Sequence, residues 1–229
     1  MKYRYLLVDN DNTLMDFSLA EHRALRETLA AFRLPSDEGA CALYARLNDA
    51  LWHDLEQGKT TFAVLRVERF AQLLAHLTRG DVPPEALCDG YEARLSTHAE
   101  LMPGAMALLE ALHGPMKIAL VSNGISRIQR GRLSVCPFAP LLDAVIISEE
   151  LGVSKPNPAM VDAALDALGC QDRHQAVFLG DSLTADVAAA RAAHIDCVWL
   201  APPGQSSPLP TYTVHSLDEA RALLASMTA

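Results

Sequence analysis

The stretch YRYLLVDNDNT, residues 3–13, decides the fold. It opens with a short apolar run over residues 3–8, which favours β-structure and ends abruptly at Asp9. A run this short is typical of a strand that is covered on both faces of a sheet. The polar loop that follows carries two carboxylates two residues apart, Asp9 and Asp11, and ends at Thr13. We therefore expect a buried strand that presents acidic side chains at one edge of a sheet.

The second half of the chain repeats this pattern. Further apolar runs lie at residues 117–121, 144–147, 176–179 and 197–200, and a last short strand is expected at 211–215. Stretches with the apolar spacing of helices lie between or after them, at residues 105–113, 159–168, 184–193 and from about 217. Alternating strands and helices indicate βαβ units with right-handed crossovers. We predict an α/β fold with a Rossmann-like parallel sheet.

A helical insert interrupts this rhythm after the first strand. No convincing strand is predicted between residues 17 and 98, and helical spacing occurs at 19–32, 40–56, 61–77 and 84–95. Proline and glycine separate these segments. We therefore expect an α/β core formed by residues 1–16 and 99–229, with an inserted helical cap domain formed by residues 17–98.

Length and composition narrow the possible classes of function. The 229 residues are 50% apolar, which is enough for a real core, and the net charge of −9 argues against a nucleic-acid polymer as partner. The charge also argues, at first sight, against anionic substrates. No uncharged apolar run is long enough for a membrane span, so no membrane partner is expected. Five scattered cysteines without a C-x-x-C pair favour reduced thiols and a cytoplasmic location.

Four polar clusters fall at the carboxyl ends of predicted strands. They are residues 9–13, residues 122–124 (SNG), Lys155 with Pro156, and Asp181 with Asp186. Ligands of open parallel sheets bind outside the carboxyl ends of the strands, so we expect these clusters to converge. Their carboxylates suit Mg²⁺, one carboxylate can attack phosphorus, and a second can transfer protons. A hydroxyl, backbone amides and a lysine can hold the phosphoryl oxygens.

The order D-N-D-N-T, S-N-G, K-P and G-D-x-x-x-x-D resembles the haloacid dehalogenase superfamily. The resemblance implies that Asp9 is the nucleophile and a Mg²⁺ ligand. It implies that Asp11 is the general acid and base, with its backbone carbonyl on the metal. Asp181 would complete the metal site, and Asp186 would support it from behind or through water. Dehalogenases of this superfamily lack an aspartate at the position of Asp11, so the resemblance favours phosphoester chemistry.

The resemblance also implies how a phosphoryl group is held. Thr13 would support the turn and contact the phosphate, Ser122 and the backbone at Asn123 would bind the phosphoryl oxygens, and Lys155 would bridge the nucleophile and the phosphate. The helical insert resembles the C1-type cap of the superfamily, which closes over the site and contacts the leaving group. A small phosphorylated metabolite is therefore the expected partner, while the oligomeric state is left open.

A narrower resemblance points to the pyrimidine 5′-nucleotidase branch. It rests on Asn48-x-x-x-Trp52, Gly58 and Arg69-Phe70, on S-N-G with Gln129-x-x-Arg132-Leu133, and on ISEELGVSKPN and CVWL. Asn48 and Trp52 are its candidate specificity residues, although the helical spacing of Trp52 is more typical of a core side chain than of a ligand stack. The resemblance implies a nucleoside 5′-monophosphate as substrate. Phosphoglycolate or a sugar phosphate is the alternative, and the complete catalytic set argues against a non-catalytic binding protein.

Two positions depart from the family pattern. Asn12 stands where many relatives have Gly or Asp, and asparagine tolerates turn conformations. His194 stands where relatives commonly have Gly, directly after the helix of Asp186. A residue just past a helix end often adopts the left-handed conformation, so we predict a left-handed His194.

Overall fold

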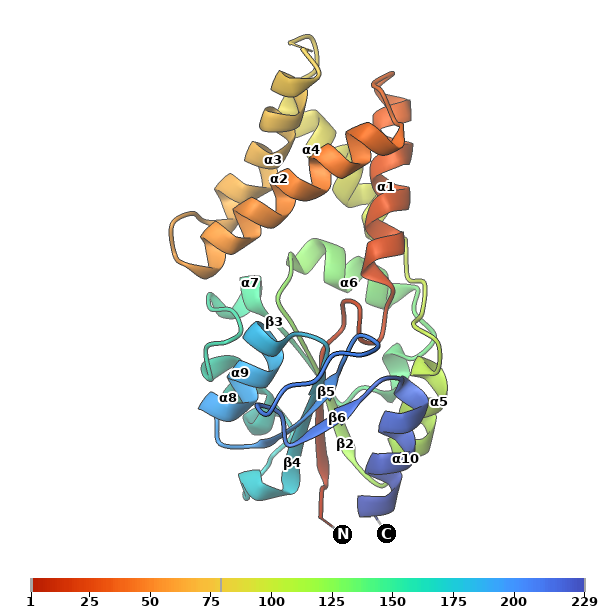
Figure 1. Ribbon diagram of the computed structural model, residues 1–229, viewed down its shortest axis with the longest axis vertical. Helices are drawn as coiled ribbons and strands as arrows, with labels where there is room; N and C mark the ends of the chain where they lie inside the picture. Colours follow the sequence, from red (N-terminus) through yellow and green to blue (C-terminus); the bar gives the residue numbers. More distant parts are fainter. Residues whose placement is uncertain (1, 79, 229) are drawn as a thin grey trace.

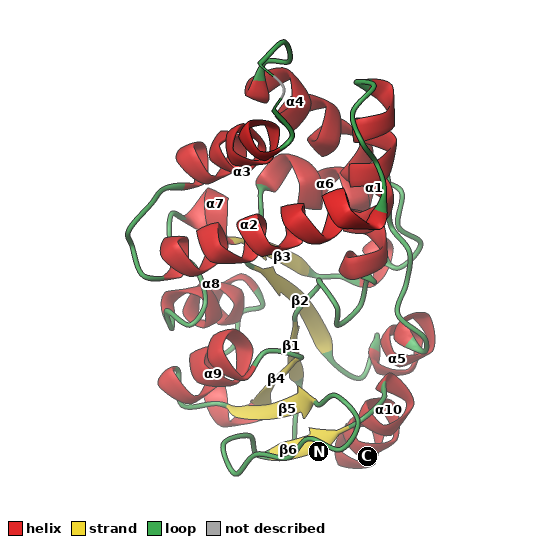
Figure 2. Ribbon diagram, turned by 45° about the horizontal axis from the view of Figure 1, so that its top comes forward, coloured by secondary structure: helices red, strands yellow, loops and turns green. Residues whose placement is uncertain are grey.

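The computed structural model describes residues 2–78 and 80–228. Six parallel strands form one sheet in the order β3-β2-β1-β4-β5-β6, which confirms the predicted α/β fold (Figures 1 and 2). The strands are β1 (Tyr5–Val8), β2 (Lys117–Ser122), β3 (Ala144–Ile147), β4 (Ala176–Gly180), β5 (Asp196–Leu200) and β6 (Tyr212–Val214). Strand β1, which belongs to the stretch quoted first, therefore lies near the middle of the sheet, between β2 and β4.

Helices cover both faces of the sheet, which explains why the strands are apolar throughout. Leu6 and Val8 of β1 pack in one buried cluster with α5 (Ala105–Leu112) and α10 (Leu217–Thr228). Leu7 points to the other face, where the second cluster contains α8 (Ala159–Ala167) and α9 (Ala188–Ala192). Successive side chains of a strand alternate between faces, so a sheet with two buried faces needs an apolar residue at every position.

Four helices of the insert stand above the carboxyl ends of the strands (Figure 1). We call them the helical unit: α1 (Phe17–Ala31), α2 (Glu38–Glu56), α3 (Phe62–His76) and α4 (Pro84–Leu95). The sequence explains three of the N-terminal caps. The side chains of Asp16, Asp37 and Thr61 each accept a hydrogen bond from the backbone N of the residue three positions later. In the part of the chain that the structure describes, no helix is long and apolar enough to cross a membrane.

Two helices are absent from the sequence-based prediction. Helix α6 (Ser126–Ser134) follows the S-N-G motif and lies between the sheet and the helical unit, and α7 (Ser148–Leu151) is a single turn after β3 (Figure 2). Helix α6 reads SRIQRGRLS and has only two large apolar residues, Ile128 and Leu133, so no apolar stripe marks it. The predicted helix at 184–193 is also divided, into a π-helical turn (Leu183–Val187) and α9.

Both departures from the family pattern have left-handed backbones. His194 has a φ of 55°, which confirms the prediction for this residue, and Asn12 has a φ of 60°. The Asn12 side chain uses this conformation, because its Oδ1 accepts hydrogen bonds from the backbone N and the hydroxyl of Ser18, at 3.1 Å each. The loop of residues 9–13 is thereby tied to the first turn of α1.

Candidate active site

The predicted clusters meet at the carboxyl edge of the sheet. They line one cavity together with Trp52, which α2 contributes from above. We call it the acidic cavity, and its lining includes Asp9, Asp11, Trp52, Asn123, Lys155, Asp181 and Asp186. The strand order brings these residues together, because β1 lies between β2 and β4 and all three run in the same direction.

Lys155 is the buried cation of the acidic cavity. Its Nζ lies 2.5 Å from Oδ1 of Asp9 and 2.8 Å from Oδ1 of Asp186, and it donates to the carbonyl of Val121 at 2.8 Å. Burial alone would lower the pKa of the ammonium, but the carboxylates of Asp186 and Asp9 outweigh it and raise that pKa. Lys155 therefore stays charged and is fixed beside the carboxylate of Asp9.

Three carboxylates share this single ammonium. Oxygens of Asp9, Asp181 and Asp186 lie within 4.8 Å of one another. Burial, with repulsion from neighbouring carboxylates, raises the pKa of Asp9, and the same two causes raise that of Asp181 to about 6. A divalent cation among these oxygens would relieve the repulsion and keep Asp9 ionised. Oxygen-rich ligands with excess negative charge are what Mg²⁺ requires, so the residues present fit this ion.

Asp186 and Asp181 are each held in place by a neighbouring contact. A side chain on Gly180 would place its Cβ 2.3 Å from Oδ2 of Asp186, so only glycine leaves room for this carboxylate. That same oxygen accepts a hydrogen bond from the backbone N of Ser182 at 3.0 Å. Asp181 is anchored through its backbone, because its carbonyl accepts from the indole of Trp199 at 2.7 Å. Both carboxylates are thus held by β4, β5 and the turn that follows β4.

The predicted phosphate contacts lie beside these carboxylates. Ser122 is buried, and its hydroxyl has no hydrogen-bond partner within residues 2–78 and 80–228. Asn123 uses both ends of its side-chain amide on the backbone of Lys155, at 2.7 and 2.8 Å, and these bonds hold its side chain against that loop. Thr13 is buried, with its hydroxyl 3.5 Å from Oδ1 of Asp181. A buried hydroxyl without a hydrogen-bond partner is unfavourable, and a bound ligand could supply the missing partner.

Asp11 is held by two residues that the prediction did not include in the site. Arg132 of α6 forms an ion pair with Oδ1 of Asp11, and Gln129 donates to its Oδ2 at 2.6 Å. Gln129 is itself fixed, because its Oε1 accepts from the amide of Asn10 at 2.6 Å. The spacing Gln129-x-x-Arg132 places both side chains on one face of α6. This spacing in the sequence could have indicated that the two residues act together. It could not indicate their partner Asp11, which lies 118 and 121 residues earlier in the chain.

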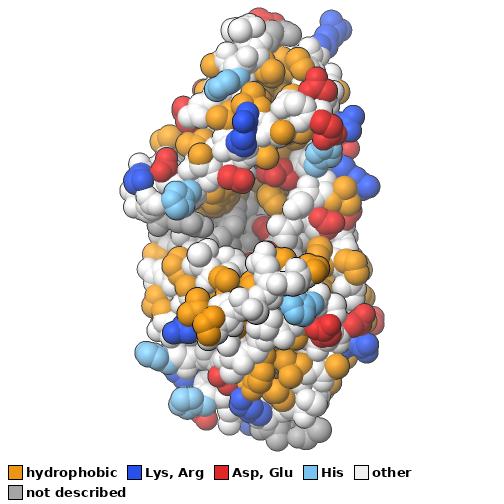
Figure 3. Space-filling view, viewed as in Figure 1, with side chains coloured by type: hydrophobic (Ala, Val, Ile, Leu, Met, Phe, Trp, Pro, Cys, Tyr) orange, Lys and Arg blue, Asp and Glu red, His pale blue; other side chains and the backbone are white. Residues whose placement is uncertain are grey.

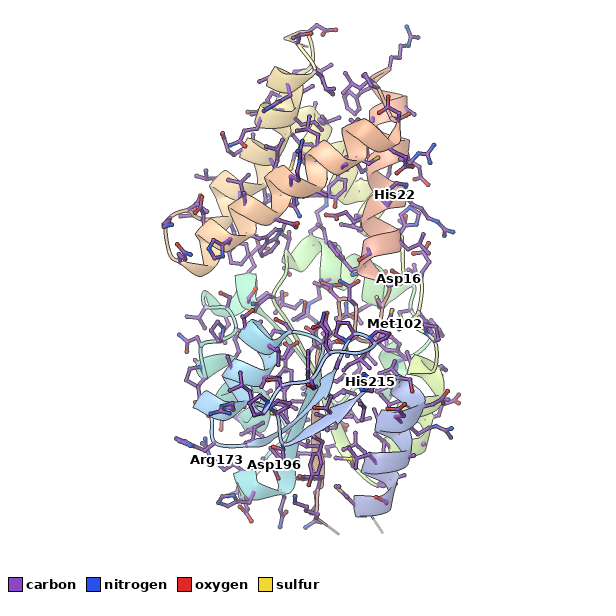
Figure 4. The ribbon with its side chains drawn as sticks, viewed as in Figure 1. Asp16, His22, Met102, Arg173, Asp196 and His215 are labelled. Atoms are coloured by element: carbon purple, nitrogen blue, oxygen red, sulfur yellow. The ribbon has the colours of Figure 1, made fainter. Side chains whose placement is uncertain are left out.

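Arg132 also contacts the first residue of the helical unit and the connection that leaves this unit. Its Nε donates to the carbonyl of His98 at 2.8 Å, and its guanidinium lies 5.6 Å from the ring centre of Phe17. The segments that enter and leave the helical unit are hydrogen-bonded to each other. The backbone N of Met102 donates to the carbonyl of Leu14, and that of Asp16 donates to the carbonyl of Glu100, at 2.9 Å each. Asp16 and Met102 lie at this junction in Figure 4.

A second cavity of about 400 Å³ lies between the helical unit and the sheet with its covering helices, which we call the sheet unit. We call it the interface cavity, and Figure 3 shows the molecule hollowed at this level. It shares Asp11, Trp52 and Asn123 with the acidic cavity, so the two spaces adjoin. Asn48 is buried in its wall, and Trp52 faces both cavities with its ring edge-on to Phe62 at 5.9 Å. The structure thus brings both candidate specificity residues to the space beside the carboxylates.

Comparisons with known proteins show the family to which this chain belongs. The family model for the haloacid dehalogenase-like hydrolases matches residues 3–194. Pyrimidine 5′-nucleotidase PynA of Streptococcus pneumoniae is 31% identical over 96% of this chain and 94% of its own length. Pyrimidine 5′-nucleotidase YjjG of Escherichia coli is 30% identical over 98% of this chain and 99% of its own length.

A solved structure shows the same arrangement over nearly the whole chain. The magnesium-bound HAD-hydrolase YfnB of Bacillus subtilis superposes with a TM-score of 0.89 at 29% identity, covering 98% of this chain and 99% of that one. The family model covers far more than half of the residues, and the two nucleotidases match over nearly their full length. The chain therefore belongs to the haloacid dehalogenase-like hydrolase family and is an enzyme of its phosphatase type.

Proposed function

We propose that this phosphatase hydrolyses pyrimidine nucleoside 5′-monophosphates with Mg²⁺, through an aspartyl-phosphate. The observation that carries the proposal is that the two cavities adjoin at Asp11, Trp52 and Asn123, which line both of them. A phosphate beside Asp9 would place its leaving group in the interface cavity, whose volume suits a nucleoside and whose walls include Phe17, Trp52 and Tyr91. The names of the two nucleotidase relatives support this substrate class.

Asp9, Asp181 and the backbone carbonyl of Asp11 would hold the magnesium ion, with Asp186 supporting the site. When bound, the ion neutralises negative charge on the phosphate and on the carboxylates that face it. This resolves the apparent conflict between an acidic chain and an anionic substrate, because the local charge at the loaded site differs from the net charge of the molecule.

The reaction divides into two displacements at phosphorus. A carboxylate oxygen of Asp9 attacks, the bond between phosphorus and the 5′-oxygen breaks, and Asp11 gives a proton to the departing oxygen. Water then attacks the aspartyl-phosphate, Asp11 takes its proton, and the carboxylate of Asp9 is released with inorganic phosphate. Lys155, the Ser122 hydroxyl and the backbone at Asn123 would hold the phosphoryl oxygens in both steps.

The helical unit would act as the cap of this site. We assign the cap to residues 17–98 and the catalytic core to residues 1–16 and 99–229. The structure of YfnB is described as revealing an interdomain movement, which supports a cap that opens and closes. Closure would exclude water from the phosphoryl group and bring Trp52 over the leaving group. A cytoplasmic location stays a prediction from the five cysteines, none of which is in a disulfide.

A phosphate-release panel tests the proposal. UMP and dTMP should be hydrolysed faster than phosphoglycolate and sugar phosphates, and chelation of Mg²⁺ should stop the reaction until the ion is restored. A preference for phosphoglycolate or a sugar phosphate would overturn the nucleotide assignment. Full activity in a chelator would overturn the metal assignment.

A further inference from the structure

The stretch CVWL, residues 197–200, brings one polar side-chain atom to the turn that carries Asp181. Trp199 of β5 is 2% exposed and packs in the apolar cluster that contains α8 and α9. Its indole Nε1 donates to the backbone carbonyl of Asp181 at 2.7 Å. An indole suits a core position where its N–H reaches an acceptor, whereas a phenyl ring would fill the apolar space without one. This hydrogen bond is therefore what tryptophan adds at position 199.

The indole takes over where the backbone pairing of β4 and β5 ends. Gly180 and Trp199 are the last pair in the register of these two strands. Asp181 follows directly, and the chain then turns away into the π-helical turn at Leu183–Val187. Beyond the last pair of a ladder, backbone groups need hydrogen-bond partners from elsewhere. The side chain of Trp199 supplies such a partner, and it thereby ties the backbone at Asp181 to β5.

The carboxylate of Asp181 is held less closely than those of Asp9 and Asp186. Oxygens of Asp9 and Asp186 lie 2.5 and 2.8 Å from Nζ of Lys155. The hydrogen bond that Asp181 accepts from the hydroxyl of Thr13 is 3.5 Å long, which is at the weak end of the range. Repulsion from the carboxylate of Asp186 also acts on Asp181. The position of this carboxylate therefore depends on the backbone that carries it.

We propose that Trp199 is a positioning residue for the metal site: by holding the carbonyl of Asp181, its indole places the carboxylate of Asp181 for Mg²⁺. The inference rests on the proposed function, which takes Asp181 as a ligand of the ion. Mg²⁺ requires nearly ideal octahedral geometry at short distances, so a small displacement of one ligand weakens binding. Loss of a group that orients a metal ligand typically costs about 10- to 100-fold in affinity for the metal.

Trp199→Phe tests the hydrogen bond, because it removes the N–H and keeps an aromatic side chain in the core. Mg²⁺ alone is the probe, and its binding is followed as the rise in melting temperature with Mg²⁺ concentration. We expect the dissociation constant of Mg²⁺ to be about 10-fold higher in Trp199→Phe than in wild type. A dissociation constant equal to that of wild type would overturn the proposal.

The control is Val198→Ala, at the neighbouring position of β5. Val198 is fully buried and belongs to the apolar cluster on the other face of the sheet, so its truncation destabilises the strand without removing the contact to Asp181. The melting temperature should fall in this variant, while the dissociation constant of Mg²⁺ stays that of wild type. An equal weakening of Mg²⁺ binding in both variants would show that the stability of β5 governs the site, and would overturn the proposal.

Hydrolysis of UMP separates metal affinity from chemistry. In Trp199→Phe, the Mg²⁺ concentration that gives the half-maximal rate should rise about 10-fold, while kcat at saturating Mg²⁺ stays within about twofold of wild type. We expect this split because Asp9, Asp11 and Lys155 keep their places. A general distortion of the active site would instead lower kcat at saturating Mg²⁺, and that result would overturn the proposal.

A second replacement keeps the shape of the indole. Benzothienylalanine in place of Trp199 has sulfur where tryptophan has N–H, so it removes the donor alone, and the same loss of Mg²⁺ affinity is expected. Should both replacements fail to fold, the indole N–H resonance of Trp199 in wild-type enzyme decides the matter. It should shift when Mg²⁺ is added, and an unchanged resonance would overturn the proposal. Trp52→Phe identifies this resonance, because the chain has two tryptophans.

Two outcomes distinguish failure of this inference from failure of the proposed function. Absence of both Mg²⁺ binding and Mg²⁺-dependent hydrolysis in wild-type enzyme would overturn the metal assignment and this inference with it. Mg²⁺-dependent hydrolysis of UMP with the same affinity for the ion in wild-type enzyme and in Trp199→Phe would overturn this inference alone.

Discussion

Arg132 is fully buried and forms an ion pair with Asp11, the carboxylate that stands two residues after Asp9. The same guanidinium donates to the carbonyl of His98, in the connection that returns from the helical unit to the sheet unit. One side chain thus joins the proposed acid–base group to the chain segment on which the cap would pivot. Asp11 is therefore oriented by the same contacts that fix the position of the helical unit.

Replacing Arg132 should impair proton transfer to the leaving oxygen. Lysine keeps the charge but cannot bond Asp11 and His98 at once, so we expect Arg132→Lys to lower kcat for UMP about 10- to 100-fold through misplacement of Asp11. The loss should be smaller for 4-nitrophenyl phosphate, because nitrophenolate leaves without protonation. Steady-state kinetics with both substrates measures the difference.

The control for this substitution is Arg130→Gln on the same helix. Arg130 is half exposed and pairs with Glu150 on the surface, so its loss should leave both kcat values near those of wild type. Equal losses for the two substrates in Arg132→Lys would show that Arg132 acts on something other than proton donation.

Asp9→Asn should abolish turnover. An amide keeps the shape of the side chain but cannot attack phosphorus, and losses of about 10⁴-fold or more in kcat are typical for a missing nucleophile. Phosphate release from UMP measures the loss, and mass spectrometry of the quenched wild-type enzyme should detect one phosphoryl group on Asp9. The control is Asp218→Asn at the surface of α10, whose carboxylate is 70% exposed. Retained activity in Asp9→Asn contradicts the mechanism.

Glu21 should make the stability of the protein depend on pH. Burial raises its pKa from an ordinary value of 4.5 to about 7. Between these values the folded state binds more protons than the unfolded state, so the free energy of unfolding contributed by Glu21 falls as the pH rises through this window. The loss is about 2 to 3 kcal/mol between pH 5 and pH 8. Glu21→Gln should therefore be more stable than wild type at pH 8 and similar to it at pH 5.

Denaturant unfolding at the two pH values measures this effect. The control is Glu38→Gln, because Glu38 is 77% exposed and its carboxylate stays hydrated. If the free energy of unfolding of Glu21→Gln changed with pH as it does in the wild type, Glu21 would not be the source of the pH dependence.

His194 should store a small amount of backbone strain. Its φ of 55° is left-handed, a conformation that costs a residue with a Cβ about 1 kcal/mol relative to glycine. We expect His194→Gly to be about 1 kcal/mol more stable than His194→Ala. Both variants lack the exposed imidazole, and only glycine adopts the left-handed conformation without strain. Chemical denaturation of the two variants provides the comparison, and a more stable alanine variant would contradict it.

The sheet and the acidic cavity were predictable for a simple physical reason. Strands buried on both faces leave continuous apolar runs, and parallel strands bring their carboxyl ends to one edge. Once the runs ending at Asp9, Ser122 and Gly180 are recognised, the convergence of their neighbouring side chains follows without further information. The left-handed His194 was predictable in the same way, from the geometry of a helix end.

The contacts of Arg132 and Arg69 were not predictable from local patterns. Arg132 lies on a helix without an apolar stripe, and its partner Asp11 is separated from it by 121 residues. Arg69 was noted only as part of a family resemblance, and only packing shows that it is buried and donates to Asn48. Such properties depend on which groups tertiary structure leaves unsatisfied, and no spacing in the sequence records that.

The position of α6 has a consequence for the thermodynamics and the redesign of this protein. Ile125 and Ile128, at the start of α6, belong to the same buried apolar cluster as the four helices of the insert. Residues 17–98 interrupt the sequence of the sheet unit, but their removal would expose this apolar face to water. We expect a single cooperative unfolding transition for the whole chain. An exchange of specificity between relatives would therefore need to transplant the upper face of α6 together with the insert, since the boundary of the cooperative unit does not coincide with the boundary of the insertion.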